Sequence, residues 1–515
     1  MSKVASDHLY LLIRSLSKSE KRAFTLYAER HQNGKGRKFV RLFQAFAKQK
    51  AHNEQKILDR HKDFDPIQLP NMKAHLYKEV LSSLRLLNSN RSGDMYLASL
   101  IDNARILYDK CLYKDCIRML DKAKVFAELH RKPVMLLEIL NFEKRVARQT
   151  IAGKNEARVN SVIRQTEAVS ESIRHINIFS NLAFSLNAYY VKKGFVRNED
   201  DLKEVSSFFQ NSLPHYNISK LTFHEKTHLY QAFTGYYFFI QDFRKGLEYS
   251  IKWVTLFDEN PDMIRDLPEL YIRSLNSLLV GQSKLVRQEE FLHTFRKLVS
   301  LKKRKDIRKT GHIMMILQKA IYVHEINRHY LNGTFTEGTR IVNRLKSELV
   351  NVLPVLDKHS VLLFYYKIAC LYFGSDNHKE AVKWLNLIIH SKEGDVREDL
   401  HEFARILALI SNFELGNEEM IENQVKSLYR FLLRKGSLSR FEQLILRFLR
   451  RLSGVQTEKR LKPLFTELKA NMEKLEHQRF ERRAFLYFDI ISWLKSKIEK
   501  RSVQEVLLEK ATAGK

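Results

Sequence analysis

Apolar residues between Tyr365 and Ile388 recur at intervals of three and four positions, and a polar triplet at 375–377 interrupts them once. This spacing is typical of helices that bury one face. A short polar break between two such runs is typical of a turn. The stretch therefore predicts two short antiparallel helices with small residues where they cross.

Two other stretches repeat the design when they are aligned on their turns: Leu100–Leu129 and Tyr230–Phe257. In each of the three, the second helix has a small residue near its start: Cys116, Gly246 and Ala381. Weaker units offer corresponding markers in steps of 39–47 residues, and these are Val205, Phe291, Gly338 and Met420. A period of that length predicts a helical solenoid.

The two ends of the chain have helical periodicity without a clear repeat. At the N-terminus the runs are 6–14, 18–31, 37–49, 53–62 and 69–88, and at the C-terminus they are 438–453, 457–475 and 478–500. We expect an all-α fold with an N-terminal helical cap region at 1–95, repeats over 96–430 and a C-terminal helical cap at 431–515. A DNA-reading helix-turn-helix at 53–88 is disfavoured, because the break from His61 to Leu69 is longer than the usual turn.

The small, branched and aromatic positions of the three hairpins follow a known pattern. The third hairpin has Tyr365, Ile368, Ala369, Tyr372, Ala381, Leu385 and Ile388. The first has Leu100, Ala104, Leu107, Cys116, Leu120 and Ala123, and the second has Tyr230, Phe233, Tyr237, Gly246 and Trp253. On these residues the chain resembles the tetratricopeptide repeat family, and long bacterial proteins with similar repeats, over about residues 96–430. The resemblance implies stacked hairpins whose inner helices line a concave, peptide-binding surface. The period is longer than the family's, so helices or turns must be extended.

Composition agrees with an all-helical chain. There are only 17 Gly and 8 Pro in 515 residues, and the prolines fall where the periodicity pauses, as expected of residues that end or begin helices. The three cysteines form no CxxC pair, so we expect small buried residues rather than disulfides. No signal peptide is recognisable at the N-terminus, and no apolar run is long enough to span a membrane. The sequence therefore predicts a soluble, cytoplasmic protein.

The net charge of +30 would attract polyanions or acidic protein surfaces. The alternative is that the basic residues only solubilise the exposed faces of helices. Residues 1–90 hold 18 Lys and Arg against 8 Asp and Glu, and residues 431–515 hold 20 against 10. The densest local cluster combines six basic residues in eight positions: Lys302, Lys303, Arg304, Lys305, Arg308 and Lys309. We regard it as a candidate anion-binding site able to neutralise phosphates. The alternative is a solvated loop, and no aromatic residue is interleaved for base stacking.

The sequence shows no complete catalytic or metal-binding motif. Gly34-Lys35-Gly36 has neither the spacing of a phosphate-binding loop nor a preceding strand. Glu290 and His293 form one Glu-x-x-His, but a di-metal helical bundle needs two. No HExxH and no G-x-S-x-G occurs. We therefore expect no enzyme activity, no cofactor and no metal, with a site assembled from distant helices as the open alternative.

The resemblance also supplies candidate groove residues on the inner helices: Arg105, Tyr108, His228, Gln231, Phe238, Phe239, Tyr366 and Phe373. The alternative is that these aromatic side chains pack between repeats. The leading hypothesis is a non-catalytic scaffold that holds another protein or peptide, and the basic charge favours an acidic one. The second is a nucleic-acid-associated protein that binds phosphates through its basic ends and the 302–309 cluster.

Overall fold

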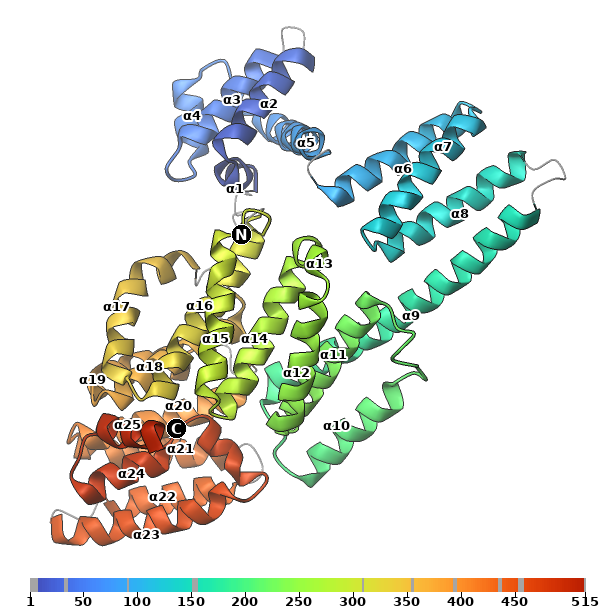
Figure 1. Ribbon diagram of the computed structural model, residues 1–515. Coiled ribbons are helices and arrows are strands. Elements are labelled where there is room, and N and C mark those ends of the chain that lie inside the picture. The colour runs from blue at the N-terminus through green and yellow to red at the C-terminus, as the bar shows by residue number, and fades with distance from the viewer. Residues whose placement is uncertain are drawn as a thin grey trace. The chain divides into compact units, whose positions relative to one another are not determined.

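The computed structural model describes residues 8–31, 36–89, 92–150, 156–307, 310–352, 356–391, 396–433, 438–452 and 458–513 (Figure 1). Within these ranges every regular element is a helix, so the all-α fold class is confirmed. The chain divides into two compact units, residues 1–173 and 174–515. Each unit is described separately, and the boundaries expected at 95 and 430 stay a prediction.

The first unit begins with helices that match the five predicted runs to within a few residues. They are α1 (His8–Ser15), α2 (Lys18–His31), α3 (Gly36–Lys48), α4 (Glu54–Arg60) and α5 (Leu69–Asn88). Their apolar faces form one core around Ile13, Leu42, Phe46 and Leu76, which are fully buried. A hairpin follows, made of α6 (Gly93–Asp109) and α7 (Tyr113–Leu129), and α8 (Pro133–Thr150) packs against α7. The long α9 (Glu156–Lys193) runs from this unit into the next.

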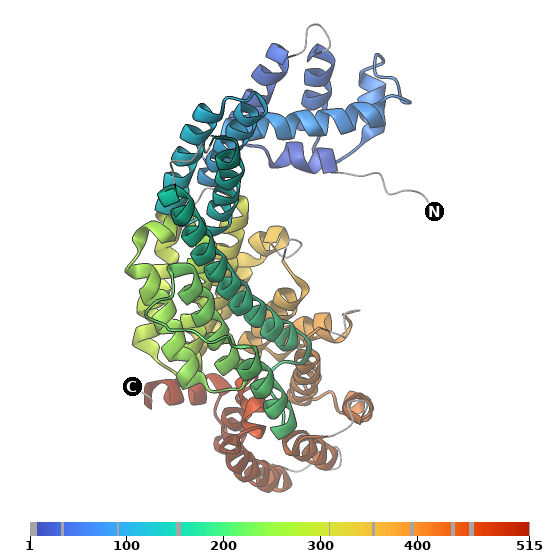
Figure 2. The ribbon, with the colours of Figure 1, turned by 90° about the vertical axis from the view of Figure 1, so that its right-hand side faces the viewer.

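The second unit is a succession of helices in which each hairpin contacts the next. The first ones are α10 (Glu199–Ser212), α11 (Phe223–Phe239), α12 (Phe243–Asp258), α13 (Pro261–Asp266), α14 (Pro268–Lys284) and α15 (Gln288–Ser300). They are followed by α16 (Gly311–Asn332), α17 (Phe335–Val352), α18 (Lys358–Gly374), α19 (His378–Ile389), α20 (Glu398–Glu414) and α21 (Glu418–Leu433). Contacts join α12 to α14, α14 to α16, α16 to α18 and α18 to α20, an order compatible with a helical solenoid (Figures 1 and 2).

One turn geometry recurs between consecutive helices. The turns have a left-handed residue at Cys111, Arg131, Gln241, Val286, Gly333, Asp376 and Gly416. In each, the amide of the following residue donates to the carbonyl five positions earlier at 2.8–3.1 Å, as in a Schellman motif. The last five of these residues are 40–47 positions apart, which agrees with the predicted period. The turn expected at 375–377 is confirmed, with Asp376 at its centre.

The small residues lie where paired helices cross. Cys116 and Ala381 are fully buried. Gly246 of α12 faces the ring of Phe238 in α11 so closely that a Cβ there would lie 2.2 Å from Cδ1. The small residue at position 246 therefore has a steric cause, because a larger side chain would force α11 and α12 apart or displace the ring of Phe238.

The C-terminal region differs from the prediction. The described helices α22 (Arg440–Leu452) and α23 (Glu458–Glu476) match it, but 478–500 is not one helix. It contains a 3₁₀ turn, η3 (Glu481–Leu486), and then α24 (Ile490–Glu499), which starts where Asp489 accepts a hydrogen bond from the Ser492 amide at 3.1 Å. Tertiary contacts of Tyr487 and Phe488, described below, override the local helical pattern.

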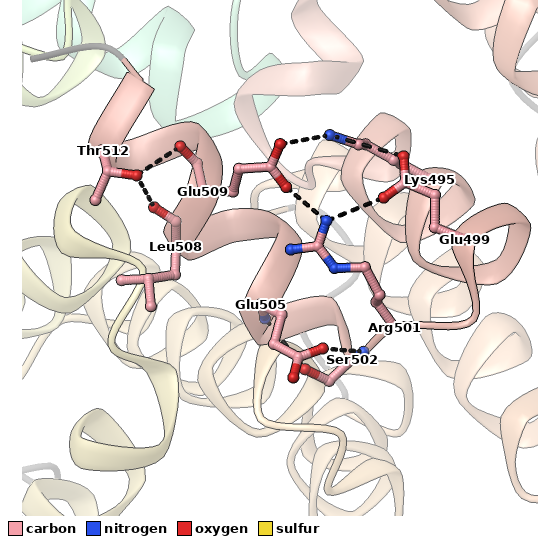
Figure 3. Close-up of polar contacts among 8 residues, drawn as sticks. All are labelled: Lys495, Glu499, Arg501, Ser502, Glu505, Leu508, Glu509 and Thr512. Carbon is pink, nitrogen blue, oxygen red and sulfur yellow. Dashed lines mark hydrogen bonds and ion pairs between the residues drawn. The ribbon is translucent and has the colours of Figure 1, made fainter.

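The last helix, α25 (Val503–Ala513), folds back onto the middle of the second unit. It contacts α16 and α18. Gln504 accepts hydrogen bonds from the amide and hydroxyl of Thr336 at 2.8 and 2.6 Å. Figure 3 shows that Arg501 bridges Glu499 and Glu509 at 3.1 and 2.7 Å, which fixes the turn between α24 and α25. The C-terminal part is thus integrated with the repeats by contacts that its sequence periodicity does not show.

Among the described residues no helix is sufficiently long and apolar to cross a membrane.

Candidate functional site

The eight predicted groove residues are divided between the two compact units. Arg105 and Tyr108 lie on α6 in the first unit, and the other six lie in the second. Arg105 is exposed and pairs with Asp102 at 2.9 Å and with Glu138. The ring of Tyr108 packs edge-on against Phe142 at 5.7 Å. In the first unit, then, one predicted residue is already salt-bridged and the other packs inside a repeat.

The positions of Tyr366 and Phe373 do not fit the open groove that was predicted for them. Both are buried, at 3 % and 1 % exposure. The ring of Tyr487 lies 6.3 Å from that of Tyr366, and the ring of Phe488 lies 4.8 Å from that of Phe373. The chain's own C-terminal segment therefore covers this face of α18, and neither residue can line an open surface in this structure.

Phe239 and Phe238 also act as packing residues. Phe239 is 5 % exposed. Phe238 is half-buried, and its ring fills the space that Gly246 of α12 and Gly281 of α14 leave free, since a Cβ at either glycine would lie within 3.2 Å of a ring atom. For these two, the alternative interpretation as residues that pack between repeats agrees with the structure.

His228 and Gln231 lie half-buried on α11. His228 Nδ1 is 3.3 Å from Gln231 Oε1. Burial lowers the pKa of His228, so its imidazole is neutral at neutral pH. Neither residue is enclosed, and α11 also carries the half-buried rings of Tyr230, Phe233 and Tyr237.

That group, the tyrosine patch, is formed by five half-buried side chains from α11, α12 and the segment before α11: Tyr216, Tyr230, Phe233, Tyr237 and Tyr249. Tyr249 stacks on Phe233 at 4.6 Å and on Tyr237 at 5.5 Å. Burial raises the pKa values of all four tyrosines. Neighbouring tyrosines add to the effect at Tyr216, Tyr237 and Tyr249, and Glu259 adds to it at Tyr230. Lys245 lies 5.5 Å from the ring of Tyr237, and Lys252 lies 4.7 Å from that of Tyr249.

The basic cluster is a turn between α15 and α16. Lys302 and Lys303 belong to the 3₁₀ turn η1 (Leu301–Lys303), and both Lys303 and Lys305 are exposed. Arg304 is engaged by Asp306 through two hydrogen bonds, Nε–Oδ1 at 3.2 Å and Nη2–Oδ2 at 2.6 Å. The remaining predicted members, Arg308 and Lys309, lie outside the described residues. Nucleic-acid binding by this turn stays a prediction.

A buried ionic centre around Arg397 is absent from the sequence prediction. Arg397 is 1 % exposed and has a left-handed backbone, with φ of 53°. Its guanidinium donates two 2.8 Å hydrogen bonds to Asp399 and lies 4.8 Å from the ring of Tyr190. Burial alone would raise the pKa of Asp399, but the charge and hydrogen bonds of Arg397 and the Tyr487 hydroxyl lower it. The centre joins α9, α20 and the C-terminal segment, and no local sequence pattern predicts it.

Besides this ionic centre, a pair of carboxyl groups is buried between α20 and α22. Glu402 and Glu442 are 3 % and 5 % exposed. Burial, together with a hydrogen bond to Glu402, raises the pKa of Glu442 to about 9, so the pair holds a proton at neutral pH. The amide of Ser439 donates to Glu442 at 2.9 Å, as in the capping of α22. This geometry explains Glu442 as a capping residue of α22.

No group of three His, Cys, Asp or Glu placed to hold a metal occurs in the described ranges. Comparison with protein-family models gives no match, and no curated protein is significantly similar to the chain. The functional argument therefore depends on the residues themselves.

Proposed function

We propose that the protein is a tetratricopeptide-like scaffold that holds an acidic segment of another protein on the tyrosine patch of α11 and α12. The observation that carries the proposal is the patch itself, in which five aromatic rings from three segments remain half-exposed. Tyrosine provides a large contact area at low cost in conformational entropy, and it is enriched among the residues that dominate binding energy. An isolated exposed ring needs no explanation, but a group of half-buried rings in which Phe233, Tyr237 and Tyr249 stack on one another does.

Charge determines the kind of partner that we expect. Lys245 and Lys252 lie over rings of the patch, and each keeps its ammonium group exposed at the rim. Asp242, Glu248 and Glu259 are nearby and oppose them in part. The whole chain carries a net charge of +30, which attracts acidic surfaces over distances of about one Debye length. An acidic segment with apolar side chains would match both the rings and their rim.

The test compares capture by three forms of the full chain: wild type, the double variant Tyr237→Ala/Tyr249→Ala, and Phe184→Ala. Phe184 is 75 % exposed on α9 and serves as a matched control for the loss of an exposed aromatic ring. Circular dichroism first verifies that all three are folded. We expect a partner that wild type and Phe184→Ala retain and that the patch variant loses, with retention falling as salt rises.

Amide hydrogen exchange on the purified complex then locates the contact. Protection of α11 and α12 by the partner supports the proposal. Equal capture by the patch variant and wild type, or no retained protein at any salt concentration, refutes it.

A further inference from the structure

A groove in the second unit lies between the last turns of α20 and α24 and the N-terminal half of α23. Its volume is about 1090 Å³, which is comparable with the largest sites that hold small molecules, at about 1,000 Å³. None of its lining residues belongs to the tyrosine patch or to the 302–309 cluster. The groove is therefore a separate candidate binding site.

Much of the lining is apolar. The ring centroids of Phe413 and Phe465 are 6.3 Å apart, and the ring of Phe465 packs edge-on against Trp493 at 5.8 Å. Leu461, one helical turn before Phe465, and Ile498 of α24 are half-buried and extend the apolar lining. An apolar chain that covers these side chains would remove both surfaces from water, which is favourable.

Three lysines add positive charge to the same lining. Lys462 belongs to α23, Lys497 belongs to α24, and Lys500 directly follows α24. Lys462 is exposed and, within the described ranges, has no carboxylate within 4 Å of its ammonium group. An anion bound in the groove could therefore pair with Lys462 without displacing a carboxylate of the protein.

The two carboxylates of the lining already have partners within the protein. Glu414 is 10 % exposed, and it accepts hydrogen bonds from Trp493 Nε1 at 2.6 Å and from Lys497 Nζ at 2.5 Å. Glu467 Oε2 lies 2.7 Å from Nη1 of Arg451, in α22. The groove thus offers ammonium donors to a ligand, whereas its carboxylate acceptors are engaged.

This distribution of polar groups distinguishes between classes of ligand. A peptide in the groove would bring backbone N–H groups, each of which needs an acceptor. The hydroxyl of Thr466, which also lines the groove, is held by the carbonyl of Lys462 in its own helix at 3.0 Å. A fatty acid brings an apolar chain and a carboxylate that only accepts hydrogen bonds. It therefore matches the lining better than a peptide does.

We propose that this groove binds an amphipathic carboxylate, whose linear acyl chain lies against Phe413 and Phe465 and whose anionic end pairs with Lys462. Burial of the chain provides most of the affinity. The ion pair selects the charge of the ligand, because a charge-assisted hydrogen bond is about twice as strong as a neutral one. The inference is independent of the tyrosine patch and needs no protein partner.

The first test measures binding of decanoate to the full chain by titration calorimetry, below the critical micelle concentration. Acetate has the same charge without the chain, and decyltrimethylammonium has the chain with the opposite charge. We expect both controls to bind at least about tenfold more weakly than decanoate. From hexanoate to octanoate to decanoate, the affinity should rise about two- to fourfold per methylene, with the higher value for complete burial.

The second test locates the site with the variant Lys462→Glu. Lys474→Glu is the matched control, because Lys474 is exposed on the same helix and does not line the groove. Lys462→Glu should lower the affinity for decanoate about tenfold, whereas Lys474→Glu should keep the wild-type affinity. In wild type, bound decanoate should slow the amide exchange of α23 and α24 and leave that of α11 and α12 unchanged.

Absence of decanoate binding by wild type, equal binding of decyltrimethylammonium, or equal affinity of the two folded lysine variants would overturn the proposal. Protection of α11 and α12 in place of α23 and α24 would also overturn it, since decanoate would then bind to the tyrosine patch. Both substitutions are at exposed positions, and circular dichroism verifies that the variants are folded. Calorimetry and amide exchange of wild type decide the matter even if a variant misfolds.

Discussion

Replacing Gly246 with alanine tests whether close helix approach governs the hairpin. A Cβ at position 246 would lie 2.2 Å from Phe238 Cδ1 and 2.3 Å from Cε1. Carbon atoms prefer a separation of about 3.5–4.0 Å, so the ring would have to move by more than an ångström. It has little room to do so, because its Cζ is 3.2 Å from the position of a Cβ at Gly281, and the ring of Phe243 lies 5.9 Å away.

The magnitude follows from two opposing terms. Overpacking of this kind costs about 1–3 kcal/mol, and replacing a helical glycine with alanine gains about 1 kcal/mol. Gly246→Ala should therefore destabilise the hairpin by about 0–2 kcal/mol. Gly235 in the facing helix α11 is the matched control, because a Cβ there meets no atom within 4 Å. Gly235→Ala should stabilise the hairpin by about 1 kcal/mol.

Amide hydrogen exchange of α11 and α12 is the suitable assay, since a chain of two units need not unfold in one step. The protection of the two variants should differ by about 1–3 kcal/mol. In a Phe238→Leu background the penalty of Gly246→Ala should largely disappear, as a double-mutant cycle would show. Equal protection in Gly246→Ala and Gly235→Ala would refute the steric argument.

Three further substitutions test local strain, proton linkage and the docking of the last helix. Val286 is 54 % exposed with φ of 56°, so Val286→Gly should raise the amide-exchange protection of α14 and α15 by about 1 kcal/mol. Val299→Gly within α15 should lower that protection by about 0.5 kcal/mol. A loss of protection in Val286→Gly would contradict the strain. Glu442, with its pKa raised to about 9, keeps a proton in the folded chain that the unfolded chain releases above about pH 4.5, so its contribution to stability falls as pH rises from 4.5 to 9. Glu442→Gln should remove this part of the dependence of unfolding free energy on pH, up to about 1.4 kcal/mol per pH unit. An identical pH dependence in wild type and variant would exclude this linkage. Gly333 has φ of 68°, and a Cβ there would lie 2.7 Å from Leu508 Cα. Gly333→Ala should therefore displace α25 from its contact and speed the amide exchange of that helix. Unchanged exchange of α25 would show that the backbone contact is unimportant.

The sequence by itself determined the helices and their pairing. Periods of three and four residues placed the N-terminal helices α1 to α5 and the three clearest hairpins close to their observed bounds. Local signals are sufficient there, because an amphipathic stripe and a polar break act within about twenty residues. The crossing positions Cys116, Gly246 and Ala381 could also be predicted from the sequence, because a close helix crossing requires a small side chain at a fixed position.

Tertiary structure alone decided which inner positions remain exposed. Tyr366 and Phe373 have the pattern of groove residues, but Tyr487 and Phe488, more than a hundred positions later, cover them. The same return of the chain brings Lys284 to the carbonyl of Leu486 and Tyr487 to Asp399. Periodicity describes one helix and its neighbour in sequence, whereas burial and pKa depend on every segment that packs nearby, however distant along the chain.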